Sequence, residues 1–312
     1  MIVIARTRIT SRLRVCRIAV LYGLVAALSG CALSPLATRT AAFSTAASAA
    51  IQQTTNAYQL VNQTYADSQM ANLVATYDTT GFDPSKIQPF IPDKDLQVRT
   101  QVLNGLNQYA TLLAEVSGNQ PITDLETQAT AAGNTLVKLQ QTDFSAFKIS
   151  PTQQNLAVTA VAAIGAVLIE RERARALPGI LDKMNKPIQD ICAILESDIG
   201  TVDQPGLANE LHLDYDSQIA AQQKFIRDNA STMTADRKRT EIQALPKLVL
   251  AQRQSDQALA ATAKSLTALA AAHAALTATK TQKDAPAFKL KLSELVQNAQ
   301  AINTFYSSLS AK

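Results

Sequence analysis

Apolar residues recur along most of the chain at alternating steps of three and four, which is the period of an α-helix with one buried face. The clearest stripes lie at 98–116, 125–139 and 288–309. No stretch of four or more residues alternates strictly between apolar and polar, as a half-buried strand would. The pattern therefore predicts an all-α protein: an elongated antiparallel bundle of about eight helices, some of them long and coiled-coil-like.

Helix-breaking and helix-capping residues set the expected boundaries. Ser150, Pro151 and Gln153 combine an N-cap, a first-turn proline and a capping-box glutamine, so a helix should begin there. Pro178 marks either a turn or a kink, and Pro246 is expected to break the helix that contains it. The expected helices cover 41–78, 94–117, 122–142, 151–176, a fifth that ends near 200, 206–231, 234–281 and 286–310.

The N-terminal segment has the organisation of a secretory signal. Residues 1–17 hold five arginines and no acid, and an uncharged apolar run follows from 18 to 28. That run is too short to span a bilayer as a helix. It ends in Leu28-Ser29-Gly30-Cys31, and this order of basic, apolar and small residues before a cysteine resembles the lipobox of bacterial lipoprotein precursors.

The resemblance implies a lipid anchor. In that family the cysteine thiol is alkylated with diacylglycerol, the preceding peptide is removed, and the new N-terminus is acylated, so Cys31 would become the first residue of the mature protein. Ala32 stands where an aspartate favours the inner membrane, which implies an outer-membrane protein facing the periplasm. We therefore expect a signal peptide (1–30), a tether (31–45) and one helical domain (46–312). An ordinary signal peptide cut nearby, or an uncleaved anchor, is the alternative.

Charge and cysteine content further restrict the classes of protein that fit this sequence. The formal charge of the whole chain is +4, from 29 basic and 25 acidic residues. Five of the basic residues lie in the leader, which leaves 24 basic against 25 acidic and a charge near −1. Nucleic-acid binding requires a basic surface, so we expect no nucleic-acid partner. Cys192 would be the only cysteine left free after lipidation, and its apolar neighbours predict a buried thiol.

Catalytic signatures are missing from the sequence. His212 and His273 are the only histidines, and they have no ligand-like spacing with one another or with cysteine. Asp214 and Asp216 lie two apart, so they do not share a helix face. The sequence has no nucleophile elbow and no phosphate-binding glycine loop. We expect no enzyme activity, cofactor or metal.

The segment 156–169 contains fourteen uncharged, mostly apolar residues. Fourteen residues are fewer than the roughly twenty needed to cross a bilayer. The segment is therefore interpreted as a central core helix, with a membrane-inserting or self-associating hairpin as the alternative.

Two connections carry more apolar side chains than linkers need. The proline-rich stretch 78–95 and the stretch 142–150 should meet at the end of the bundle opposite the membrane tether. There they would either plug the open end of the core or form an apolar tip that docks a partner. The candidate partner-binding residues are Phe82, Ile87, Phe90, Ile91, Phe144 and Phe147.

These expectations lead to a functional hypothesis without a catalytic site. The chain would be a membrane-anchored periplasmic lipoprotein that acts as a binding or structural-adaptor protein for a partner in the cell envelope. Alternatives are an inhibitor or immunity protein against a periplasmic toxin or hydrolase, a hydrolase with dispersed carboxylates, and a sensor with a closed ligand cavity.

Overall fold

The described residues of the computed structural model are 34–81, 83, 88–118, 123–169 and 177–309. Apart from an isolated bridge between Thr201 and Gln204, they contain helices and turns only, which confirms the all-α prediction. The helices are α2 (Pro35–Thr80), α3 (Asp93–Gly118), α4 (Thr123–Leu136), η3 (Gln141–Phe144), α5 (Pro151–Ile169), α6 (Leu177–Ile199), α7 (Leu207–Asp228), α8 (Ala235–Ala278) and α9 (Pro286–Leu309).

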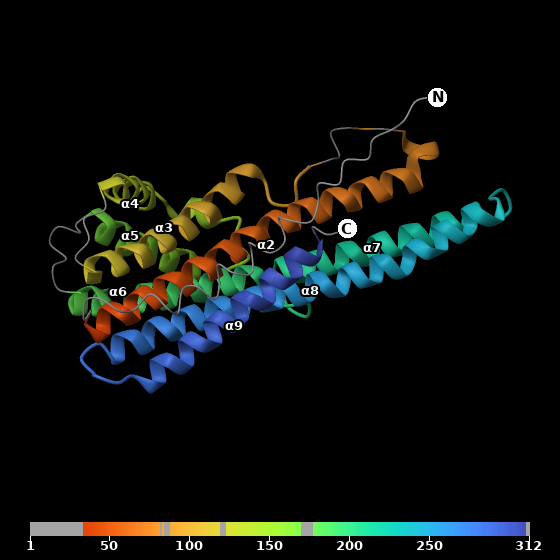
Figure 1. The fold of residues 1–312 in the computed structure, drawn as a ribbon. Coiled ribbons are helices and arrows are strands. Elements are labelled where there is room, and N and C mark those ends of the chain that lie inside the picture. Colours follow the sequence, from red (N-terminus) through yellow and green to blue (C-terminus); the bar gives the residue numbers. More distant parts are fainter. Residues whose placement is uncertain (1–33, 82, 84–87, 119–122, 170–176, 310–312) are drawn as a thin grey trace, which may run out of the picture. The chain divides into compact units, whose positions relative to one another are not determined.

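The two longest helices organise the bundle in Pro35–Lys312, which is one compact unit. Helix α2 has 46 residues and packs against α3, α7, α8 and α9, while the 44-residue α8 packs against α6, α7 and α9 (Figure 1). At 1.5 Å per residue these helices are about 69 and 66 Å long. The stripe predicted on α3 and the described part of the stripe on α9, from 288 to 302, face inward, and one continuous apolar core joins the helices.

Helix α5 contains the uncharged segment 156–169 and packs against α3, α4 and α6. Its backbone touches α4, because a Cβ atom added at Gly133 would lie 2.8 Å from the carbonyl oxygen of Gly165. Among the described residues, α5 and α8 are long and apolar enough to cross a membrane by length and composition. Core helices of soluble proteins often satisfy the same criterion, and much of each helix is buried inside the bundle.

The predicted start of α5 is confirmed. The backbone N–H of Ser150 donates to Oε1 of Gln153 at 2.8 Å, and the N–H of Gln153 points back to Oγ of Ser150 at 3.4 Å. Nε2 of Gln153 also donates to Oγ of Ser197 at 3.2 Å. The first turn of α5 therefore lies beside the last turns of α6, so the two helices are antiparallel. The chain turns before α6, and Pro178 occupies the first turn of that helix.

The tether predicted over 31–45 is wrong from residue 35 onward. Helix α2 begins at Pro35, and Phe43 is buried in the core. The Arg39 guanidinium holds this end in place by donating to the carbonyl oxygens of Thr279 and Gln282, in the connection between α8 and α9. The sequence of this stretch resembles a linker because it has few large apolar residues. Alanine nevertheless favours the helical conformation, and its small side chain allows close packing.

Two other boundaries also differ from prediction. Helix α4 ends at Leu136, and the following residues form a turn and the short 3₁₀ helix rather than a helix to 142. Helix α8 continues without a break through Pro246. A proline removes one backbone hydrogen bond and crowds the preceding turn. Because Pro246 is exposed, the carbonyl that it leaves unpaired is at the surface of the helix, where water can reach it.

Candidate functional site

The six residues predicted to form an apolar docking tip do not form one together. Phe144 and Phe147 are 0% and 3% exposed and pack against each other with ring centroids 5.2 Å apart. Ile91 is 3% exposed, and the half-buried Phe90 packs on Tyr65. Phe82 and Ile87 lie outside the described residues. The buried side chains cannot meet a partner in the folded protein, so the docking prediction is wrong for Ile91, Phe144 and Phe147.

These buried rings instead close one end of the core. The Arg99 guanidinium lies 4.2 Å from the centre of the Phe147 ring and donates to the carbonyl oxygen of Ala146 at 3.0 Å. Asn62 on α2 accepts from the N–H of Ile91 at 2.6 Å and donates to its carbonyl oxygen at 2.9 Å. Both connections are therefore fastened to helices of the bundle, as the core-plug alternative requires.

A buried ion pair lies directly beneath this plug. Arg99 on α3 and Asp198 on α6 are joined by two hydrogen bonds of 2.8 Å. The carboxylate also accepts from the Tyr58 hydroxyl at 3.0 Å and from the N–H of Lys148 at 2.8 Å. The cluster thereby joins α2, α3, α6 and the connection that contains Phe147.

The electrostatics of this cluster favour a structural role. Burial raises the pKa of Tyr58 well above its ordinary value, and the negative charge of Asp198 adds to the effect. Burial would lower the pKa of Arg99, but the charge and hydrogen bonds of Asp198, together with Tyr58 and Asp95, outweigh burial, and the net shift is upward. Both upward shifts keep the proton on its group, so Arg99 stays charged and Tyr58 stays neutral. The sequence gives little sign of this site, because an arginine next to an apolar stripe normally lies at the surface.

The cysteine and the two histidines of the described chain lie at separate places in the bundle. Cys192 is buried as predicted, and burial raises its thiol pKa to about 12. His273 is also buried and contacts Tyr109, while His212 lies at the surface between α7 and α8, with Nδ1 2.9 Å from Asp256. Within the described ranges, no group of three or more histidine, cysteine or acidic residues could hold a metal ion.

The candidate binding surface is a hairpin formed by the end of α7 and the first half of α8. No side chain from 219 to 251 is buried, whereas both helices contribute to the core on either side of that range. Figure 1 shows these helix ends continuing side by side to the turn that joins them. We call residues 219–251 the α7–α8 hairpin.

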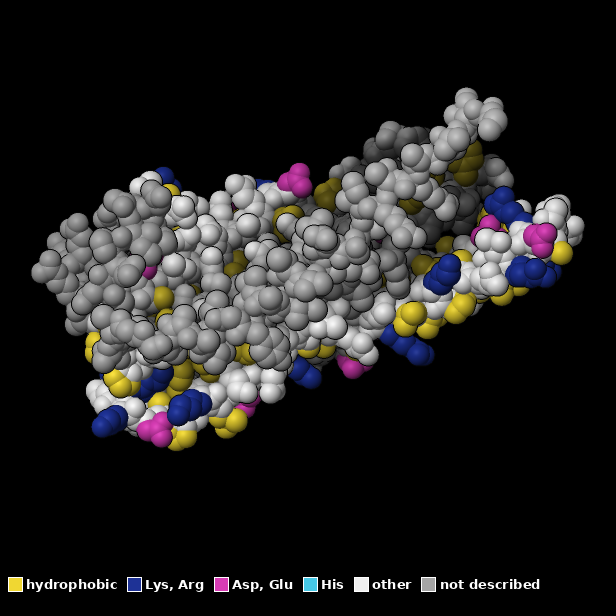
Figure 2. Space-filling view, viewed as in Figure 1, with side chains coloured by type: hydrophobic (Ala, Val, Ile, Leu, Met, Phe, Trp, Pro, Cys, Tyr) yellow, Lys and Arg dark blue, Asp and Glu magenta, His cyan; other side chains and the backbone are white. Residues whose placement is uncertain are grey.

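The α7–α8 hairpin is basic and partly apolar at its surface. Its three acids are each paired with a nearby base, in Lys224–Asp228, Arg237–Glu241 and Arg239–Asp236. Arg227, Lys238 and Lys247 remain without an ion-pair partner among the described residues and give the hairpin a net charge of +3. Ile242 and Leu250 are 46% and 48% exposed beside these charges. Figure 2 shows the basic and hydrophobic side chains interspersed along this part of the molecule.

The hairpin turn lies far from the point where the helical unit begins. Arg39, near the start of α2, contacts the connection that follows α8, and the hairpin turn precedes α8. The length of α8, about 66 Å, therefore separates the start of the helical unit from the hairpin turn.

The described part of the chain is thus an all-α bundle with a projecting basic hairpin. No family model, curated protein or solved structure matches it.

Proposed function

We propose that this chain is a membrane-anchored periplasmic lipoprotein and a non-catalytic adaptor that binds an acidic protein partner through the α7–α8 hairpin. The observation that carries the proposal is the run of 33 consecutive residues, 219–251, in which no side chain is buried.

The chemistry of the hairpin indicates what it binds. Complementary charge steers association and selects against partners of the same sign. Arg227, Lys238 and Lys247 favour an acidic surface, and the exposed Ile242 and Leu250 supply apolar area that a partner would remove from water. Arginine is also a common anchor residue in protein interfaces.

The position of the hairpin suits an adaptor on a lipid anchor. Cys31 precedes the first residue of α2 by only four positions, so lipidation there would hold the start of α2 close to the membrane. The hairpin turn at the other end of α8 could then reach a partner up to about 66 Å from the anchored end.

The anchor is tested by acylation of the native precursor. Cells grown with labelled palmitate should incorporate the label into the wild-type protein but not into Cys31→Ala, and the variant should leave the membrane fraction. A matched Cys192→Ala variant should label like the wild type, because that thiol is buried. Labelling of Cys31→Ala would reject the proposed anchor.

The adaptor role is tested by photocrosslinking in the native host. A photoreactive residue at Ile242 should capture one discrete acidic protein, whereas the same residue at Leu290, which is 59% exposed on α9, should not. Triple charge reversal of Arg227, Lys238 and Lys247 to glutamate should abolish the crosslink without changing helicity by circular dichroism. Equal capture from both positions, or capture that survives the reversal, would reject the hairpin as the docking surface.

A further inference from the structure

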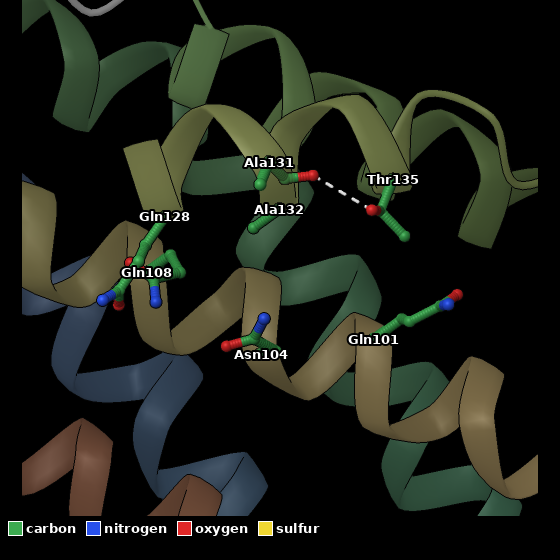
Figure 3. A pocket seen from close by; sticks show the side chains of 7 residues that line it. All are labelled: Gln101, Asn104, Gln108, Gln128, Ala131, Ala132 and Thr135. Atoms are coloured by element: carbon green, nitrogen blue, oxygen red, sulfur yellow. Dashed lines mark hydrogen bonds between the residues drawn. The ribbon is translucent and has the colours of Figure 1, made fainter. Parts of the chain in front are cut away.

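A polar groove runs between α3 and α4, on a part of the bundle distinct from the α7–α8 hairpin. Its volume is about 360 Å³, and Figure 3 shows carboxamide side chains from both helices around it. A second hollow of about 390 Å³ continues toward the start of α3 and shares Gln101 and Asn104 with the first. The first hollow is lined by Gln101, Asn104, Gln108, Gln128, Ala131, Ala132 and Thr135.

Polar residues on one face of α3 form a straight wall of this groove. Gln97, Gln101, Asn104 and Gln108 are separated by steps of four, three and four residues, so their side chains share one helix face. From Asp93 at one end to Gln108 at the other, the face is about 22 Å long. On the opposite wall, Ala131 and Ala132 of α4 are small enough to leave the groove open.

Gln108 lines the groove and has a side-chain oxygen without a hydrogen-bond partner in the described part of the chain. This side chain is only 9% exposed, and its Oε1 is buried without a hydrogen-bond partner in the described part of the chain. A buried polar atom of this kind costs about 1–3 kcal/mol, and most buried polar groups have a partner. The residue lines the groove, so rotation of its amide toward the groove would let a ligand lying there supply the missing donor.

The lining also restricts the class of ligand. No charged side chain lines the part between α3 and α4, so an ionic group would find no counter-charge there. No aromatic ring lines either hollow, and the stacking surface that many sugar rings use is therefore missing. A side-chain amide offers two donors and an acceptor with two lone pairs, which matches the N–H and C=O groups of a peptide unit.

We propose that the α3–α4 groove binds an extended, uncharged peptide segment through its main chain. An extended chain advances about 3.3 Å per residue, so the 22 Å face accommodates six or seven residues. The alanines of α4 restrict the side chains that face them to small ones. The site is independent of the lipid anchor and of the α7–α8 hairpin.

The test uses a phage-displayed library of random nonapeptides against the purified chain from Cys31 to Lys312, with Cys31 replaced by serine. Selected peptides should be neutral and rich in small residues. Their affinity should fall at least tenfold for Ala131→Trp, which fills the groove. Asn134→Trp places the same ring at an exposed position of α4 that does not line the groove, and affinity should be unchanged.

Gln108→Leu provides an independent measurement. It removes the acceptor that the peptide should use, while the fold should be kept because the wild-type Oε1 has no partner in the described chain. Peptide affinity should fall in this variant, with helicity and melting temperature retained. The proposal is overturned if no selected peptide is sensitive to Ala131→Trp, or if a tetramer of N-acetylglucosamine binds in the groove and the peptides do not. Neither result depends on the crosslinks from the hairpin.

Discussion

The hydroxyl of Tyr109 lies 2.8 Å from Nε2 of His273 in the core between α3 and α8. The Phe43 ring from α2 packs edge-on against the same imidazole, with centroids 5.7 Å apart. Burial raises the pKa of Tyr109, so the phenol stays protonated and shares a hydrogen bond with the imidazole. Burial also lowers the pKa of His273 to about 4, so the ring is neutral near pH 7.

This arrangement predicts a loss of stability in mild acid. The histidine takes up a proton near pH 6.5 when unfolded but only near pH 4 when folded, so the unfolded state binds more protons between these values. The contribution of His273 is complete above about pH 6.5 and is lost as the pH falls to about 4. The free energy of unfolding should decrease by about 3 kcal/mol from this group.

Urea denaturation of wild type and His273→Gln at several pH values isolates the effect. Glutamine cannot titrate, yet its amide oxygen can accept from Tyr109, so the two proteins should converge in stability as the pH falls from 6.5 to 4. A constant difference across that range would show that His273 does not control acid stability.

The buried ion pair predicts strong destabilisation by single substitutions. Asp198→Asn leaves the Arg99 guanidinium without its counter-charge in the core, and the free energy of unfolding should fall by about 3–5 kcal/mol. The double variant Arg99→Met/Asp198→Leu removes both charges and should be more stable than the summed effects of Arg99→Met and Asp198→Leu predict. Strict additivity in denaturant unfolding would contradict this coupling.

The contact between α4 and α5 predicts opposite effects for two glycine substitutions. In Gly133→Ala the new methyl group would lie 2.8 Å from the Gly165 carbonyl oxygen, so the helices must separate at a cost of about 1–3 kcal/mol. In Gly179→Ala nothing lies within 4 Å of the new methyl group, and stability should rise by up to about 1 kcal/mol. Thermal unfolding of both variants distinguishes steric crowding from helix propensity. Equal melting temperatures would contradict the close approach.

Because α8 continues through Pro246, we expect the helix to be less stable around this residue than elsewhere in the α7–α8 hairpin. Pro246→Ala restores a backbone hydrogen bond and removes ring crowding, which should stabilise this stretch by about 3 kcal/mol. Hydrogen exchange of the amides near residue 246 should slow markedly. Pro151→Ala is the control, because a proline in the first turn of α5 costs little and exchange there should barely change. Unchanged exchange around 246 would contradict the prediction.

The sequence predicts most of this fold because the helices bury periodic stripes and end at recognisable caps and breakers. The start of α5 at Pro151 is an example, since Ser150 and Gln153 are local signals that act over three residues. Pro246 shows the limit of such signals, because neighbouring turns keep a helix continuous when the unpaired carbonyl is exposed. The start of α2 was missed because its alanine-rich turns are stabilised by packing and by Arg39, whose partners lie 240 residues away.

The candidate sites were harder to predict, since each depends on contacts between distant segments. Phe144 and Phe147 could either fill the end of the core or form an exposed docking surface, and the sequence pattern is the same in both cases. Only the packed structure shows that they are buried. The spacing of Gln101, Asn104 and Gln108 is visible in the sequence, but polar residues on a helix usually face water. The groove exists only because α4 places two alanines opposite them.

The hydrogen bonds of Arg39 have a mechanical consequence. Tension applied to the N-terminal segment would enter α2 at Pro35 and pass through this guanidinium into the connection between α8 and α9. Several helices packed side by side would then share the load, and α2 would not be pulled away turn by turn. An arginine near the first turn would thus help the bundle to resist traction applied at its N-terminal end.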